Sequence, residues 1–150
     1  MKAGDLMTTG AARIRPDASL AEAVRLMVEH RISGLPVVDA QDKLVGVITE
    51  GDFLRSDDGP MPHVLAILAG GATAAAGDLR SRRVEELMTR DPVTITVETP
   101  IEEIVALMNR HKVKRLPVLT QGRVVGIVSR ANLLLALLRR LQSDGKPQRG

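Results

Sequence analysis

Two short stretches of the chain place a hydroxyl residue three positions before an acid or an amide, directly after an apolar run. They are Thr49 with Asp52 and Ser129 with Asn132. Ordinary helix capping accounts for the pattern. A hydroxyl residue before a helix can accept from a backbone N–H of the first turn, and an acceptor at the third helical position can accept from the backbone N–H of the hydroxyl residue. The same geometry presents the N–H groups of a first helical turn, which suit a phosphate, and acceptor oxygens, which suit ribose hydroxyl groups. The residues by themselves leave both interpretations open.

Two basic pairs each stand just ahead of a segment that begins Leu-Pro-Val. They are His30-Arg31 and His111-Lys112. Both pairs fall at the predicted C-terminal end of a helix, where cations interact favourably with the helix dipole. From there they could also reach a bound phosphate. A dipole role and a phosphate role are therefore both kept as interpretations.

These features occur twice because the chain contains an internal repeat. The matching segments are Leu6-Met7-Thr8 with Leu87-Met88-Thr89 and Leu35-Pro36-Val37 with Leu116-Pro117-Val118, at an offset of 81 residues, and Val45-Gly46 with Val125-Gly126, at an offset of 80. Two copies are too few for a solenoid. We therefore predict two similar half-domains, residues 1–55 and 84–142, with paired clefts where they meet.

Each copy is predicted to run strand, helix, strand, hairpin, strand, helix. The first helices are expected after Ser19 and after Thr99, with Pro100 at the first helical position of the latter. The predicted strands are residues 12–15, 35–38 and 44–49 in the first copy and residues 93–97, 116–119 and 124–129 in the second. The second helices are predicted at residues 50–55 and from 130 to about 141.

Three segments depart from the repeat pattern. The last predicted helix has more leucine than one buried face needs, so it is expected to pack on the other repeat or on a second subunit. Residues 56–83 are interpreted as an insertion with a short apolar helix at 64–69 that packs lightly on the core. Residues 143–150 are predicted to be a disordered tail.

Composition narrows the classes of function. The chain has 150 residues, no cysteine and a net charge of +3 spread over mixed acids and bases. It has no apolar leader or membrane span, which predicts a soluble, cytoplasmic protein with no membrane partner. The single aromatic residue, Phe53, argues against a nucleic-acid partner. The three histidines show no metal-ligand spacing and no nucleophile signature is present, so we expect no metal site, no catalytic residue and no enzyme activity.

Several of these motifs together resemble the cystathionine-β-synthase (CBS) domain, present as a tandem pair. The resemblance rests on the Leu-Met-Thr opening, the Val-Thr-Ile first strand, the His-Arg-Ile…Leu-Pro-Val-Val-Asp block and the Gly-Val-Ile-Thr…Asp ending. It implies an α/β fold of two β-α-β-β-α repeats packed sheet to sheet around a pseudo-twofold axis, and a homodimer. It also implies a regulatory sensor that binds an adenosine-type ligand (AMP, ADP, ATP or S-adenosylmethionine) and acts on an unknown partner protein. A structural dimerisation module with empty clefts is the alternative.

The resemblance also implies which residues meet the ligand. Thr49-Asp52 and Ser129-Asn132 would hold the ribose and phosphate, and His30, Arg31, His111 and Lys112 are candidate phosphate contacts. The base would lie against Thr8, Ala12, Gly34, Leu35 and Pro36 in one cleft, and against Thr89, Val93, Arg115, Leu116 and Pro117 in the other. Arg115 stands where the first copy has Gly34, and it could either fill the cleft or recruit an extra phosphate. Because Asp52 is also the better ribose acceptor, the sites are predicted to be unequal. The Thr49-Asp52 site is expected to fill at the lower nucleotide concentration.

Overall fold

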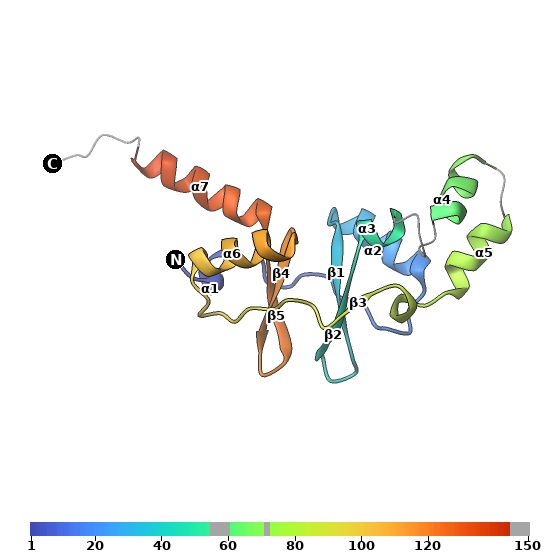
Figure 1. Cartoon of the computed structure of the whole chain (residues 1–150), viewed down its shortest axis with the longest axis horizontal. Helices are drawn as coiled ribbons and strands as arrows, with labels where there is room; N and C mark the ends of the chain where they lie inside the picture. Colours follow the sequence, from blue (N-terminus) through green and yellow to red (C-terminus); the bar gives the residue numbers. More distant parts are fainter. Residues whose placement is uncertain (55–60, 71–72, 145–150) are drawn as a thin grey trace. The chain divides into compact units, whose positions relative to one another are not determined.

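A computed structural model describes residues 1–54, 61–70 and 73–144 of the chain. The chain divides into two compact units (Figure 1). We call residues 12–92 the repeat-1 unit, and residues 1–11 together with the chain from residue 93 the repeat-2 unit. The units are not simply the two halves of the sequence, because each contains the opening segment of the other repeat. Each has helices and an antiparallel sheet, which confirms the predicted α/β class.

The sheet of the repeat-1 unit has three antiparallel strands in the order β1 (Gly34–Val38), β2 (Leu44–Thr49) and β3 (Thr89–Arg90). All of β1 is buried, as expected for a continuous apolar run. The strand predicted at residues 12–15 is reduced to one bridge, between Ile14 and Val37. The core of this unit includes Leu20, Leu35, Ile48, Phe53 and Met88.

Helix α2 (Leu20–His30) covers this core and begins as predicted. Ser19 accepts a hydrogen bond from the backbone N–H of Glu22 at 3.1 Å, so it caps the first turn. A hydrogen bond from Arg25 holds the pKa of Glu22 below its usual value. Both of these side chains lie on the surface, so the pair contributes little to stability.

Three more helices complete the repeat-1 unit: α3 (Glu50–Leu54), α4 (Met61–Leu68) and α5 (Thr73–Ser81). A short 3-10 turn, η1 (Val84–Glu86), leads into β3. Helix α4 includes the short apolar helix that the sequence predicts. Helix α5 was not predicted, because its run of alanines forms no apolar stripe. Leu79 of α5 packs against the core, which attaches the insertion to α2.

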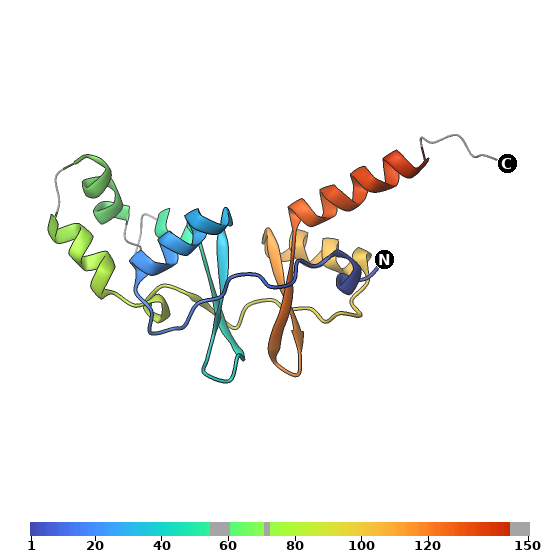
Figure 2. The same ribbon diagram turned by 180° about the vertical axis from the view of Figure 1, so that it is seen from behind.

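The repeat-2 unit is built from α1 (Ala3–Leu6), α6 (Ile101–His111), β4 (Arg115–Thr120), β5 (Arg123–Ser129) and α7 (Arg130–Asp144). The N-terminal segment lies beside α6 and β5 in both views (Figure 2). Strands β4 and β5 form an antiparallel hairpin. The core of this unit includes Ala3, Ile104, Leu116, Val118 and Val128.

Three details of the repeat-2 unit differ from prediction. Pro100 is the residue before α6 and not its first helical residue. The predicted strand at residues 93–97 makes only one bridge, between Ile95 and Val118. Helix α7 continues to Asp144, so residues 143 and 144 are helical and not part of a tail; residues 145–150 lie outside the described part of the chain. Helix α7 therefore has 15 residues.

Two glycines allow the opening segments to approach the strands. A Cβ placed on Gly46 would lie 2.7 Å from Met88 Sδ and 2.8 Å from the carbonyl oxygen of Thr89. A Cβ on Gly126 would lie 2.7 Å from Met7 Sδ and 3.0 Å from a backbone carbonyl oxygen. Glycine inside a strand often marks such a close backbone approach. The repeated Val-Gly and Leu-Met-Thr motifs are thus two sides of one contact.

The leucines of α7 are exposed. Leu133 packs against the repeat-2 core, but Leu134, Leu135, Leu137, Leu138 and Leu141 are 45% to 65% exposed. No helix in the described residues is long and apolar enough to cross a membrane.

Candidate functional site

The first candidate site lies where β2 meets α3, in the repeat-1 unit. Asp52 Oδ2 accepts hydrogen bonds from the backbone N–H of Thr49 at 2.7 Å and from Thr49 Oγ1 at 3.3 Å. Asp52 is only 6% exposed and is the one buried charged side chain among the described residues. Burial of a charge is costly unless hydrogen bonds compensate it. The Thr49 hydrogen bonds provide part of that compensation and fix the carboxylate at the strand end.

The second candidate site has the same construction in the repeat-2 unit. Asn132 Oδ1 accepts from the backbone N–H of Ser129 at 2.7 Å and from Ser129 Oγ at 2.9 Å. The backbone N–H of Asn132 donates back to Ser129 Oγ at 3.3 Å. Asn132 Nδ2 also donates to Thr8 Oγ1 at 3.0 Å. An amide can make this last bond as a donor, which a carboxylate cannot.

The second site has both capping hydrogen bonds that the sequence indicates, from the Ser129 N–H to the Asn132 side chain and from the Asn132 N–H to the Ser129 hydroxyl. The first site has the equivalent of the former bond, from the Thr49 N–H to Asp52. Helix α3 has five residues, so its dipole is small, whereas α7 has 15 residues and a full first turn. Capping does not exhaust what these groups can do, because a carboxylate or amide oxygen can accept more than one hydrogen bond.

The structure corrects the grouping expected for the two opening threonines. Thr8 pairs with Ile127, through backbone hydrogen bonds of 2.9 Å and 3.0 Å, and so belongs with Asn132. Thr89 in β3 pairs with Val47 in β2 and so belongs with the Thr49 site. The sequence order suggested the opposite assignment, because each threonine opens its own repeat. In each unit the methionine that precedes the threonine packs on a strand glycine, Met88 on Gly46 and Met7 on Gly126.

The other predicted base contacts are distributed over both units, and their contact with a ligand stays a prediction. Ala12 packs on the repeat-1 core and Val93 on the repeat-2 core. Gly34 is the strand partner of Thr49, and Arg115 is the strand partner of Ser129. The residues that follow, Leu35 and Pro36 in one unit and Leu116 and Pro117 in the other, are buried. The leucine side chains belong to the cores, so at these positions we expect the backbone to face a ligand.

The two basic pairs lie at equivalent helix ends. His30 is the last residue of α2 and His111 is the last residue of α6. Arg31 and Lys112 follow them, each in the left-handed conformation with φ of 54°. All four side chains are exposed. This is the position that the helix dipole favours, and a contact with phosphate stays a prediction.

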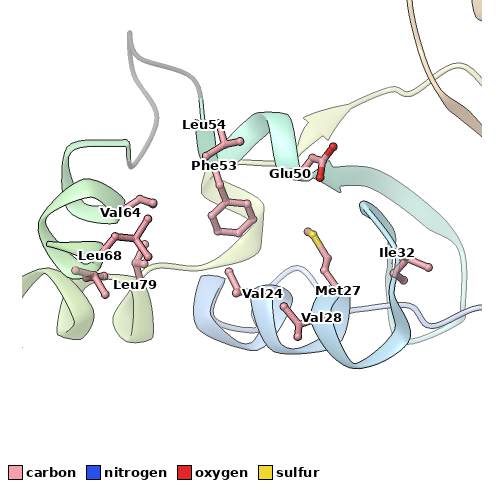
Figure 3. A pocket seen from close by; sticks show the side chains of 11 residues that line it. Val24, Met27, Val28, Ile32, Glu50, Phe53, Leu54, Val64, Leu68 and Leu79 are labelled. Atoms are coloured by element: carbon pink, nitrogen blue, oxygen red, sulfur yellow. The ribbon is translucent and has the colours of Figure 1, made fainter. Parts of the chain in front are cut away.

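The repeat-1 unit also contains a groove that sequence reasoning did not find. It has a volume of about 400 Å³ and lies between α2, α3 and α4 (Figure 3). Its lining is apolar, with Val24, Phe53 and Leu68 among its residues, and Glu50 at one edge. The apolar residues of the predicted helix at 64–69 were the available signal. Among the described residues, no group of three or more potential ligands is placed to hold a metal ion.

The internal duplication, the α/β fold and the hydroxyl–acceptor pair at the end of β2 and of β5 together define the class of protein. The sequence model of the CBS domain matches residues 3–59 and 84–139. The chain belongs to the CBS domain family.

Known relatives agree with this membership. The chain is 30% identical over 138 residues to the CBS domain-containing protein CBSX1, chloroplastic, of Arabidopsis thaliana, covering 84% of this chain and 58% of that protein. It is 31% identical over 134 residues to inosine-5'-monophosphate dehydrogenase of Methanocaldococcus jannaschii, covering 89% of this chain but 23% of the enzyme. The chain thus spans about a quarter of one relative and under two thirds of the other.

Solved structures show the same fold. The CBS-pair protein CBSX2 from Arabidopsis thaliana has a TM-score of 0.76 and 29% identity, with 94% of this chain and 96% of that chain covered. A structure of CBSX2 in complex with AMP has a TM-score of 0.74 and 29% identity, with 93% of this chain and 98% of that chain covered.

Proposed function

We propose that this chain is a regulatory module that binds an adenosine-type ligand and passes its bound state to a partner protein. AMP, ADP, ATP and S-adenosylmethionine are the candidate ligands. The observation that carries the proposal is the paired arrangement of Thr49 with Asp52 and Ser129 with Asn132, in a family whose member CBSX2 has been solved with AMP. The role we propose is binding without catalysis.

The geometry supports a ribose contact at each strand end. The acceptor oxygen of Asp52 is held within 2.7 Å of a backbone N–H, so its position is fixed before any ligand arrives. A fixed carboxylate can accept from both hydroxyl groups of a ribose, and charge-assisted hydrogen bonds of this kind are strong. The amide oxygen of Asn132 can accept in the same way but carries no charge.

Ligand binding can act on a partner only if the ligand prefers one arrangement of the chain over another. The exposed leucines of α7 and the α4–α5 insertion are the surfaces that we propose for transmitting that preference.

The test is thermal unfolding of the chain with each candidate ligand added separately. A ligand present at about 100 times its dissociation constant should stabilise the folded chain by about 2.7 kcal/mol. We expect at least one of these ligands to raise the unfolding temperature. Guanosine monophosphate is the matched control for AMP, because it differs only in the base. The absence of a shift with all four ligands would contradict the proposal.

A structural dimerisation module is the second candidate function. It is favoured by α7, whose leucines are exposed at positions 134, 137, 138 and 141, a helical spacing suited to a second copy of the chain. We propose a homodimer under either function. A dimer that forms without any nucleotide response would favour the structural function over the sensor.

A further inference from the structure

The two candidate sites carry different side chains at one position that the sheet register places beside the hydroxyl residue. Gly34 is opposite Thr49, and Arg115 is opposite Ser129. Residues directly opposite each other in an antiparallel pair share one face of the sheet, with Cβ atoms about 4.5–5.5 Å apart. The Arg115 side chain therefore leaves the sheet on the same face as the Ser129 hydroxyl. In the repeat-1 unit this position has no side chain.

The residues just before Gly34 and Arg115 differ in charge in the same way, because the repeat-2 unit is again the more positive. Ser33 precedes Gly34, and its carbonyl oxygen accepts from the backbone N–H of Glu50 at 2.9 Å. Lys114 occupies the equivalent position, and its carbonyl oxygen accepts from the backbone N–H of Arg130 at 3.0 Å. The matching hydrogen bonds show that these positions are structurally equivalent in the two units. A serine and an acid in one unit thus correspond to two bases in the other.

The acceptors at the two sites add to the difference. Asp52 is an acid, whereas Asn132 is neutral. At these four positions the repeat-1 unit has Ser33, Gly34, Glu50 and Asp52, with two formal negative charges, and the repeat-2 unit has Lys114, Arg115, Arg130 and Asn132, with three formal positive charges. These positions therefore carry opposite formal charge in the two units, and the part of the difference that lies at the hydroxyl–acceptor pairs is Arg115 in place of Gly34 and Asn132 in place of Asp52.

We propose that the sites select adenosine ligands by phosphate number. The claim rests on the proposed function and extends it. The Ser129–Asn132 site takes an adenosine polyphosphate, ATP or ADP, because the fork of N–H donors on Arg115 matches phosphate oxygens and each further phosphate adds attraction. The Thr49–Asp52 site takes an adenosine ligand with one phosphate or none, because it has no cation equivalent to Arg115 and the Asp52 carboxylate repels added negative charge while it still accepts from the ribose.

The experiment compares AMP with ATP at each site separately, by calorimetry in low salt without divalent cations. Asp52→Ala weakens binding at the first site and Asn132→Ala weakens binding at the second, so the tighter step in each titration reports the site that is unchanged. We expect the Asp52→Ala chain to bind ATP about tenfold more tightly than AMP, the value of one added charge-assisted hydrogen bond. The Asn132→Ala chain should show the opposite preference.

A matched pair of variants tests the residue itself. Adding Arg115→Gly to the Asp52→Ala chain should remove the preference for ATP. Arg123→Ser removes the same charge at the far end of β5, distant along the strand from Ser129, and should leave the preference intact. Equal effects of these two changes would overturn the proposal, as would the same ATP to AMP ratio at both sites.

Two competition measurements complete the test. If a single-site variant fails to fold, ATP added to the unaltered chain with AMP at both sites should displace AMP at residues 129–132 at a lower concentration than at residues 49–52, and displacement at both sites at the same ATP concentration would overturn the proposal. Inorganic tripolyphosphate should compete weakly with ATP, because it lacks the adenosine; competition as strong as ATP would show a bare polyanion site. Failure of every adenine nucleotide to bind would instead overturn the proposed function itself.

Discussion

Replacing Gly46 with valine is expected to destabilise the chain by about 3 kcal/mol, the upper part of the usual range for overpacking a core. A Cβ at this position meets Met88 Sδ at 2.7 Å and the carbonyl oxygen of Thr89 at 2.8 Å. The methionine side chain can move aside, but the carbonyl cannot, because Thr89 in β3 is paired with Val47 in β2. The better strand propensity of valine, worth at most about 1 kcal/mol, does not offset the clash.

Urea denaturation measures this change, and Gly77 provides the control. Gly77 lies inside α5 with nothing within 4 Å of a Cβ placed on it. Gly77→Ala should therefore raise the free energy of unfolding by up to about 1 kcal/mol, because alanine favours a helix more than glycine does. A Gly46→Val chain as stable as the unaltered chain would contradict the exchanged position of the Leu87-Met88-Thr89 segment.

Replacing Asp52 with alanine is expected to weaken AMP binding at the first site about a hundredfold. This corresponds to about 3 kcal/mol, the loss of two ribose hydrogen bonds to a charged acceptor. Asn132→Ala should weaken AMP binding at the second site about tenfold, because a neutral amide makes weaker hydrogen bonds than a carboxylate. Calorimetric titration of each variant with AMP measures both losses. Equal losses would contradict the predicted inequality of the sites.

Asp52 also has a structural role, and one more variant separates this role from the role in AMP binding. Alanine removes the acceptor that lies 2.7 Å from the backbone N–H of Thr49, so Asp52→Ala should also cost about 1–3 kcal/mol of stability. Asp52→Asn keeps an acceptor oxygen and should recover most of the stability but only part of the affinity for AMP. Unchanged AMP affinity in a destabilised Asp52→Ala chain would show that the residue only caps α3.

The sequence predicted most of the helices and the two hairpins because their apolar residues follow clear helical or strand spacing. Helix α2, with Ser19 at its start, is an example. The short strands at residues 12–15 and 93–97 were overestimated, since each makes a single bridge in the structure. Helix α5 was missed because alanine carries no periodic signal. The spacing of apolar residues predicts local structure, whereas the secondary structure of these segments depends on what they pack against.

The candidate site was predicted in the same uneven way. The hydroxyl–acceptor pairs could be found from the repeat alone, whereas Gly34 and Arg115 were placed near them only through the resemblance to the CBS domain. The exchange of Thr8 and Thr89 could not, because it depends on pairing between segments far apart in the sequence. Gly46 and Gly126 carried the available signal, since glycine is unfavourable inside a strand unless another backbone passes close by.

The binding of adenine nucleotide at the two strand ends is tested most directly by titrating isotope-labelled chain with AMP and following every backbone amide by NMR. We expect the amides of residues 49–52 to shift first and those of residues 129–132 to follow at higher AMP concentration. Amide shifts confined to the apolar groove around Phe53, or no shifts at saturating AMP, would contradict a nucleotide site at these residues.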